Sequence, residues 1–201
     1  MPEPTSTPPE PRPDTPAPAP RLARTPGWNP ATRLHRDRVP AHVRAWLFAA
    51  GSLTAHVRAQ CPGQFHLRVL REQRTRAFPG ERQALDLLPC RRARVREVAL
   101  CCAGEPLVVA RSVIPLSTLR GRQARLAGLG ERPLGALLFA DPSTRREPYE
   151  IARLALSQAG FSDPPPVAAR VWGRRAVYRL GGAPLLVCEF FLPALVEATR
   201  R

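Results

Sequence analysis

Two charged side chains occupy positions where strand alternation predicts an apolar surface. In PLLVCEFFLP, which begins at Pro184, the face that carries Glu189 also carries leucine, valine and phenylalanine, and the opposite face is apolar too. In RVREVALCC, Arg96 shares its face with Val98 and Leu100. A buried carboxylate and a buried guanidinium both need partners. If a ligand lies between them, Arg96 would bind a carboxylate, and Glu189 would face a hydroxyl group or take part in proton transfer.

The same pattern has a purely structural interpretation, an internal salt bridge between Arg96 and Glu189, and alternation alone favours neither. Three further arginines are candidates for binding an anion. Arg111 lies on an apolar face of the next predicted strand. Arg174 and Arg175 stand together in WGRR, although adjacent arginines usually mark a solvated strand face. The residues therefore indicate a small-anion site in a sheet-based core without identifying the molecule.

The composition restricts the chemistry that such a site can perform. The 201 residues include 31 basic and 16 acidic side chains, which give a formal charge of +15. All 31 basic residues are arginine. The absence of lysine excludes any mechanism that needs a Schiff-base lysine, and it excludes a lysine-bearing phosphate loop. The charge suggests nucleic acid as a partner. However, the chain has no RNA-binding signature and no regularly placed stacking aromatics, so we expect no nucleic acid to bind.

Cysteine and histidine spacing predicts neither a disulfide framework nor a metal site. The five cysteines are odd in number and include no C-x-x-C, and the four histidines show no metal-ligand spacing with them. The N-terminus has no apolar signal-peptide core, and no apolar run approaches the length of a membrane span. We therefore expect a cytoplasmic protein with no membrane span.

The site residues must be positioned by a domain that begins after a proline-rich tail. Of 25 prolines, 11 fall in the first thirty residues, so we predict a disordered tail over residues 1–38, a folded domain over 39–196 and a short C-terminal tail over 197–201. Within the domain, the segment from Val39 to Gln60 predicts two short helices broken at Gly51, with Ser52 capping the second.

Strands are expected mainly as adjacent hairpins. QFHLRVLREQ predicts a single strand, RVREVALCC and PLVVARSVIP a hairpin turning at AGE, and RRAVYRL and PLLVCEFFLP a second hairpin turning at Gly181–Gly182. Helices are predicted for LSTLRGRQARLAGLG, for PLGALLF and for REPYEIARLALSQAG, which would end at Gly160, and FSDPPPVAAR is expected to be a loop. This order favours an α+β fold on an antiparallel sheet.

Several of these blocks together resemble a known enzyme family. VREVALCCAGEPLVVARSVIPLSTL, RPLGALLF and VWGRRAVYRLGGAPLLVCEFFLP are similar to segments of the chorismate–pyruvate lyase family, and the likeness runs in consistent order from about Ala41 to Ala194. The resemblance implies one antiparallel sheet with helices packed over it and helix-turn-helix flaps that enclose a ligand. FSDPPPVAAR is an insertion relative to the compact family, near the hinge of the second flap.

The resemblance also assigns roles to individual residues. The family's carboxylate-binding arginine falls on Arg96, and the glutamate that faces the ring hydroxyl falls on Glu189. A leucine whose backbone amide helps to hold the carboxylate falls on Leu134. A methionine of the first flap falls on Leu53, where this sequence departs from the pattern; leucine can replace it if the residue works through its backbone N–H and apolar bulk.

The implied reaction is the conversion of chorismate into 4-hydroxybenzoate and pyruvate, the first committed step toward ubiquinone. Formation of the aromatic ring drives it, so no metal, flavin or nicotinamide cofactor is expected, and the catalytic residues would be Glu189 and Arg96, with Arg111 or Arg174 meeting the enolpyruvyl carboxylate. The alternative is a non-catalytic effector-binding domain of the same fold. We expect a monomer whose partners are chorismate and the two products.

Overall fold

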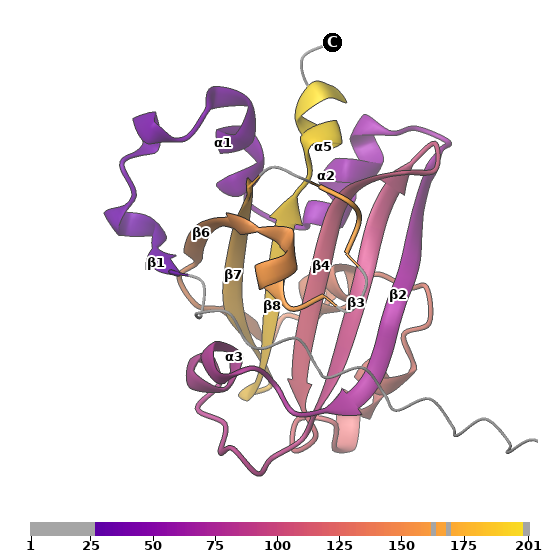
Figure 1. Cartoon of the computed structure of the whole chain (residues 1–201). Coiled ribbons are helices and arrows are strands. Elements are labelled where there is room, and N and C mark those ends of the chain that lie inside the picture. Colours follow the sequence, from indigo (N-terminus) through magenta and orange to yellow (C-terminus); the bar gives the residue numbers. More distant parts are fainter. Residues whose placement is uncertain (1–26, 162–163, 168–169, 199–201) are drawn as a thin grey trace, which may run out of the picture.

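The computed structural model describes residues 27–161, 164–167 and 170–198, and the expectations for the first 26 residues, for 162–163 and 168–169 in the predicted loop, and for 199–201 lie outside this part. Over the described residues, seven strands follow one another across the sheet in the order β1 (Asn29–Pro30), β6 (Glu150–Ala155), β7 (Arg170–Leu180), β8 (Ala183–Phe191), β4 (Glu105–Pro115), β3 (Ala93–Cys102) and β2 (Phe65–Thr75). β5 (Thr144–Arg146) also pairs with β7. All of these pairings are antiparallel. The predicted α+β fold on a single antiparallel sheet is confirmed (Figure 1).

Two hairpins form the middle of the sheet, as the sequence predicts. β3 (Ala93–Cys102) and β4 (Glu105–Pro115) turn at Ala103–Gly104, and β7 (Arg170–Leu180) and β8 (Ala183–Phe191) turn at Gly181–Gly182. Both glycines of the second turn have positive φ, which suits a tight hairpin turn. β4 pairs with β8, so the two hairpins lie side by side, and β2 (Phe65–Thr75) extends the sheet beyond β3.

Both faces of the sheet are covered, which explains why its central strands are apolar on both sides. One face belongs to a core cluster that includes Val95, Val109 and Phe190. The opposite face belongs to two clusters that include Val98 and Leu100 in one and Ile114 and Leu185 in the other.

Short helices provide these covers. α1 (Ala41–Leu47) and α2 (Leu53–Gln60) are separated at Gly51, whose φ is 77°, and the Ser52 hydroxyl accepts a hydrogen bond from the Ala55 amide at 3.3 Å, so both predicted helices and the predicted cap are confirmed. α4 (Leu134–Ala140) is the predicted short helix. α1, α2 and α5 (Pro193–Ala198) gather at one end of the sheet, and α3 (Pro79–Ala84) lies in front of it in Figure 1.

Two predicted helices have a different structure. The segment before α4 forms a 3-10 helix, η3 (Gly121–Gly128). The helix predicted to end at Gly160 is wrong over most of its length, because β6 (Glu150–Ala155) pairs there with β7 and only η4 (Leu156–Ala159) is helical. Pairing with a distant strand overrides the local helical pattern. Gly160 does end the helical turn, with φ of 81°.

The described part of the proline-rich segment, residues 27–38, contains β1 (Asn29–Pro30) and the 3-10 helices η1 (Ala31–Arg33) and η2 (Arg36–Arg38). β1 pairs with β6, and the ring of Trp28 lies 6.0 Å from that of Phe190. β5 (Thr144–Arg146) is a further short strand.

Cys61 and Cys102 form a disulfide, which corrects the expectation from cysteine spacing. Cys61 caps the C-terminal end of α2, and Cys102 ends β3 opposite Phe65. The two residues are 41 positions apart, so only the folded chain brings them together. Among the described helices, none is long and apolar enough to cross a bilayer.

Candidate functional site

A cavity lies between the sheet and two covering helices. Its sheet side is formed by Leu67, Arg96, Val98, Leu100, Ala110, Ser112, Tyr178, Val187 and Glu189. Its other side is formed by Ser52, Leu53 and Thr54, at the start of α2, and by Pro133, Leu134, Gly135, Leu138 and Phe139, at α4. All four residues that the sequence predicts for the site, namely Arg96, Glu189, Leu134 and Leu53, line this one cavity.

Arg96 is a buried cation without a carboxylate partner in the described part of the chain. It is 2% exposed, and its Nη2 donates to the carbonyl of Gly130 at 2.6 Å and to that of Arg132 at 3.3 Å. Its Nε has no hydrogen-bond partner. Burial lowers the pKa of the Arg96 guanidinium, because the cation loses its water. The salt bridge between Arg96 and Glu189 that alternation allowed is therefore absent, and Arg96 keeps a free donor at the cavity.

Glu189 pairs with a different arginine. Nε of Arg174 donates to Oε2 of Glu189 at 2.6 Å, and the two residues are direct partners across β7 and β8. Among described residues Oε1 has no donor, and the Glu189 side chain keeps 18% of its surface exposed. Glu189 can thus accept a hydrogen bond from a ligand while Arg174 neutralises its charge.

Leu53 and Leu134 are the first residues of α2 and α4. The first N–H groups of a helix have no carbonyl partner within it, so helix starts provide backbone donors. The two leucines therefore bring both apolar side chains and backbone donors to the cavity that Arg96 lines.

Two buried residues with hydroxyl groups line the cavity and were not predicted from the sequence. Ser112 and Tyr178 both line it and are 5% and 7% exposed. Burial, followed by the nearby Glu189 carboxylate, raises the pKa of Tyr178 to about 12, so it remains a neutral phenol. Tyr178 could have been found from the hairpin, because it lies on the same face of β7 as Arg174.

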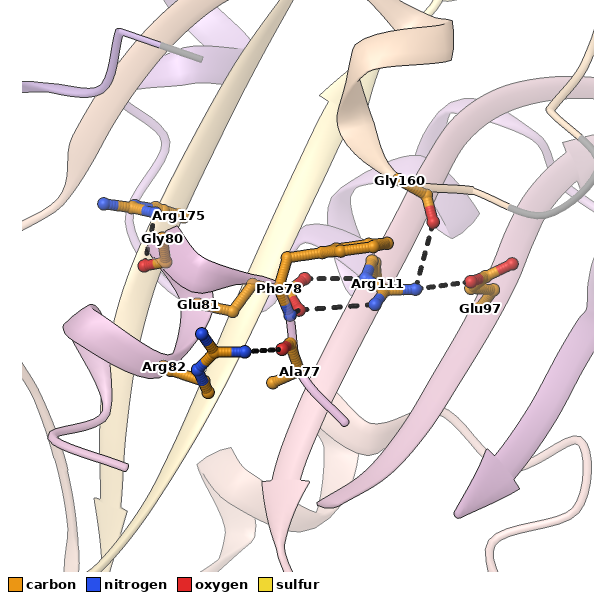
Figure 2. A network of polar contacts seen from close by, with 9 residues as sticks. All are labelled: Ala77, Phe78, Gly80, Glu81, Arg82, Glu97, Arg111, Gly160 and Arg175. Carbon is orange, nitrogen blue, oxygen red and sulfur yellow. Dashed lines mark hydrogen bonds and ion pairs between the residues drawn. The ribbon is translucent and has the colours of Figure 1, made fainter. Parts of the chain in front are cut away.

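Arg111 lies on the opposite face of the sheet and cannot meet a ligand in this cavity. Its Nε donates to Glu81 of α3 at 2.6 Å, and its Nη1 donates to Glu97 of β3 at 2.5 Å (Figure 2). The Phe78 ring covers the guanidinium, with Cζ 4.4 Å from the ring centroid. Arg111 alternates with the cavity-lining Ala110 and Ser112, so its side chain points the other way.

The neighbouring charges on that face are also buried. Glu97 is 1% exposed. Arg175 is 9% exposed, so the solvated strand face expected for WGRR is wrong. It donates to Glu150 at 2.7 Å and to the Gly80 carbonyl at 3.2 Å.

Comparisons of the sequence with known proteins indicate a single enzyme family. Residues 22–200 match the family model described as chorismate lyase. A protein of Methylococcus capsulatus named probable chorismate pyruvate-lyase is 45% identical over 162 residues, which cover 77% of this chain and 97% of that protein. One of the same name from an Azoarcus species is 46% identical over 167 residues, covering 77% of this chain and 85% of that protein.

Similar solved structures include the C-terminal domain of the histidine utilization repressor from Pseudomonas syringae pv. tomato. It is 11% identical, with a TM-score of 0.49, and the match covers 65% of this chain and 93% of that one.

Proposed function

The chain belongs to the chorismate lyase family, and from that premise we propose how its own residues eliminate pyruvate from chorismate. Its reaction converts chorismate into 4-hydroxybenzoate and pyruvate. The ring carbon that bears the hydroxyl group loses its proton, the ether bond to the neighbouring carbon breaks, and the electrons complete the aromatic ring. Pyruvate leaves as its enol form and takes up a proton on carbon.

Arg96 binds the ring carboxylate of chorismate and of 4-hydroxybenzoate. The observation that carries this assignment is the unpartnered Nε of a guanidinium that is 2% exposed and lines the cavity. A carboxylate there would complete the hydrogen bonds of Arg96 and compensate its buried charge. The backbone N–H groups of Leu53 and Leu134 would donate to the same carboxylate from the opposite side of the cavity.

Glu189 holds the 4-hydroxyl group at the other end of the ring. It is the only carboxylate among the described residues that line the cavity, and its Oε1 is left without a donor. The proton that must leave is on the carbon that carries this hydroxyl, so Glu189 is next to the bond that breaks and takes part in the proton transfer. The enzyme's contribution is orientation and electrostatics in the cavity that α2 and α4 border.

Arg174 does not meet the enolpyruvyl carboxylate in this proposal. Its Nε and Nη1 already donate to Glu189 and to backbone carbonyls. Tyr178 and Ser112 supply neutral hydroxyl donors at the cavity instead.

Incubation of the purified protein with chorismate tests the reaction. Equimolar pyruvate and 4-hydroxybenzoate should appear, without added cofactor and unchanged after dialysis against a chelator. Tight binding of 4-hydroxybenzoate with no pyruvate released would favour the effector-binding domain instead.

We further propose that the enzyme acts as a monomer in the cytoplasm and supplies 4-hydroxybenzoate for ubiquinone. Residues of a single chain line the cavity on both sides, which supports the monomer. Specific activity that is independent of protein concentration, together with a monomeric mass in solution, would agree with it. Activity that falls on dilution would contradict it.

A further inference from the structure

Arg174 is a buried arginine beside the cavity. It donates hydrogen bonds to backbone carbonyls in addition to its ion pair with Glu189. It is 3% exposed, and its Nε donates to Oε2 of Glu189 at 2.6 Å. Desolvation pulls the pKa of Arg174 down, but the Glu189 carboxylate outweighs this effect and the pKa lies above its ordinary value. The guanidinium is therefore charged at every working pH.

Nη1 of the same guanidinium donates to backbone carbonyls in the segment that leads from α1 into α2. Nη1 donates to the carbonyls of Trp46 at 3.2 Å, Leu47 at 3.3 Å and Ala49 at 2.9 Å. The first two belong to the last turn of α1, where a cation is favourable, and the Trp46 carbonyl also accepts from the Ala49 amide at 3.3 Å. Ala49 stands in the linker between α1 and α2, two residues before Gly51.

This linker determines where α2 lies over the cavity. The first residues of α2 follow it directly and form part of the cavity wall. The Tyr149 hydroxyl also donates to the Ala49 carbonyl, at 3.2 Å, so the linker is held from two side chains. We call residues 41–60, which comprise α1, the linker and α2, the first flap. Covers of this kind commonly move to admit substrate and to release product.

We propose that Arg174 is a positioning residue that couples Glu189 to the closed first flap. One guanidinium contacts both, so Glu189 is oriented best when the linker carbonyls are in place, and the linker is held best when the ion pair is intact. The site is thereby completed when the flap closes over the substrate. This inference rests on the proposed role of Glu189.

The coupling predicts two separate effects when the guanidinium is lost. Glu189 loses the donor that fixes its Oε2, so the chemical step slows. The linker carbonyls lose a charged donor, so the flap opens more often and 4-hydroxybenzoate dissociates faster. An arginine that only stabilised the fold would lower the unfolding temperature without accelerating product release.

The test uses Arg174→Lys, which keeps a cation but cannot reproduce the planar fork, and Arg174→Gln. We expect the single-turnover rate to fall about 10- to 100-fold, as for a catalytic group displaced by less than an ångström. We expect the dissociation rate of 4-hydroxybenzoate, followed by stopped-flow displacement, to rise about 10-fold. Guanidinium ions added to Arg174→Ala should restore part of the single-turnover rate.

Arg175→Gln is the matched control. Arg175 follows Arg174 on β7, is also buried and ion-paired, and faces the other side of the sheet. This variant should lose stability while both rates stay within about two-fold of wild type, since it touches neither Glu189 nor the first flap.

A double-mutant cycle with Glu189→Gln separates the two effects. In that background Arg174→Lys should change the chemical rate by less than about two-fold, because its action through Glu189 is already lost, yet still accelerate product dissociation. Folded Arg174→Lys with both rates unchanged would overturn the coupling, as would equal changes in Arg175→Gln. A wild-type chain that makes no product would instead contradict the lyase reaction itself.

Discussion

Arg96 and Glu189 lie on one face of the sheet, and their different bonding explains their different tasks. Arg96 donates to two carbonyls and its Nε has no partner, so an anionic ligand would complete its hydrogen bonds and balance its charge. Glu189 is neutralised by Arg174 and keeps a free Oε1, so a neutral hydroxyl suits it. Alternation predicted that both charges would be buried, because it fixes the face of each side chain. It could not predict their partners, because Arg174 becomes the neighbour of Glu189 only through strand register.

Arg96→Ala tests the carboxylate site. Removing a charged donor from a desolvated site should weaken 4-hydroxybenzoate binding by about 2–5 kcal/mol. Isothermal titration of the variant against wild type measures this loss, with circular dichroism to confirm the fold. Affinity equal to wild type in a folded variant would leave Arg96 as a structural residue only.

Tyr178 should give the protein a specific alkaline sensitivity. Its pKa is raised to about 12 by burial, then by Glu189, whereas a tyrosine in the unfolded chain ionises near its usual 10. Between these values the unfolded chain loses the proton and the folded one keeps it, so stability falls as pH rises from about 10 to 12, by about 2–3 kcal/mol. Urea unfolding of wild type and Tyr178→Phe at pH 9 and 11.5 measures the effect. A drop of equal size in both proteins would show that Tyr178 does not cause it.

At the scale of elements, the covers of the two faces differ in how they are attached. α3 is fixed to the sheet by a buried ion network centred on Arg111, whereas α2 and α4 border the cavity. Gly160 belongs to the same network, since its carbonyl accepts from Arg111 at 3.2 Å and a Cβ there would lie 2.1 Å from the Phe78 ring. The cover centred on Arg111 and the cover that borders the cavity are thus on opposite sides of the sheet.

Arg111→Leu should destabilise the fold by about 3–5 kcal/mol, because the buried Glu81 would lose the guanidinium that pairs with it and the buried Glu97 would lose one of its partners. Chemical denaturation measures the loss. Adding Glu81→Gln and Glu97→Gln to the same chain should restore part of it. The affinity for 4-hydroxybenzoate should stay within about two-fold of wild type, since the network faces away from the cavity. A loss below about 1 kcal/mol would contradict the structural importance of the network.

Local sequence signals predicted the elements that depend on local contacts. Gly181–Gly182 and the Gly51–Ser52 break gave the hairpin and the helix pair correctly. The segment around β6 was predicted wrongly as a helix, because it is a strand only through its pairing with β7, twenty or so residues later in the chain. The resemblance named four residues that line one cavity, and their roles there stay a prediction. The hairpin pattern could have added Tyr178, whereas Ser112 joins them only through the packing of α2 and α4 over the sheet.

At the scale of the whole molecule, only a small part of the formal charge of +15 serves the proposed function directly. Arg96 is the one arginine that our proposal places against the substrate. The buried arginines Arg111, Arg174 and Arg175 bind carboxylates of the chain itself. The remaining positive field can raise the local concentration of a small dicarboxylate such as chorismate.

Thiol counting tests the disulfide and the burial of the other cysteines. Cys90 is exposed, whereas Cys101 and Cys188 are buried and burial raises the pKa of each thiol. Without reductant, Cys90 alone should react rapidly with a thiol reagent in the native protein, and three thiols should react after denaturation. All five should react after denaturation and reduction. Five reactive thiols in unreduced protein isolated from cells would show that the disulfide does not form there, and Cys90→Ser should remove the rapid native reaction.

The disulfide at the C-terminal end of α2 fixes that end of the helix to the sheet. Cys61 ties the far end to the tip of β3, while the near end, where Leu53 and Thr54 lie, borders the cavity. The near end lies about 12 Å from the disulfide, the length of an eight-residue helix, so it moves farther than any other part of α2 in a rotation about the sulfur atoms. Reduction of the Cys61–Cys102 bond would remove this constraint and leave α2 held only by its packing and by the chain on either side.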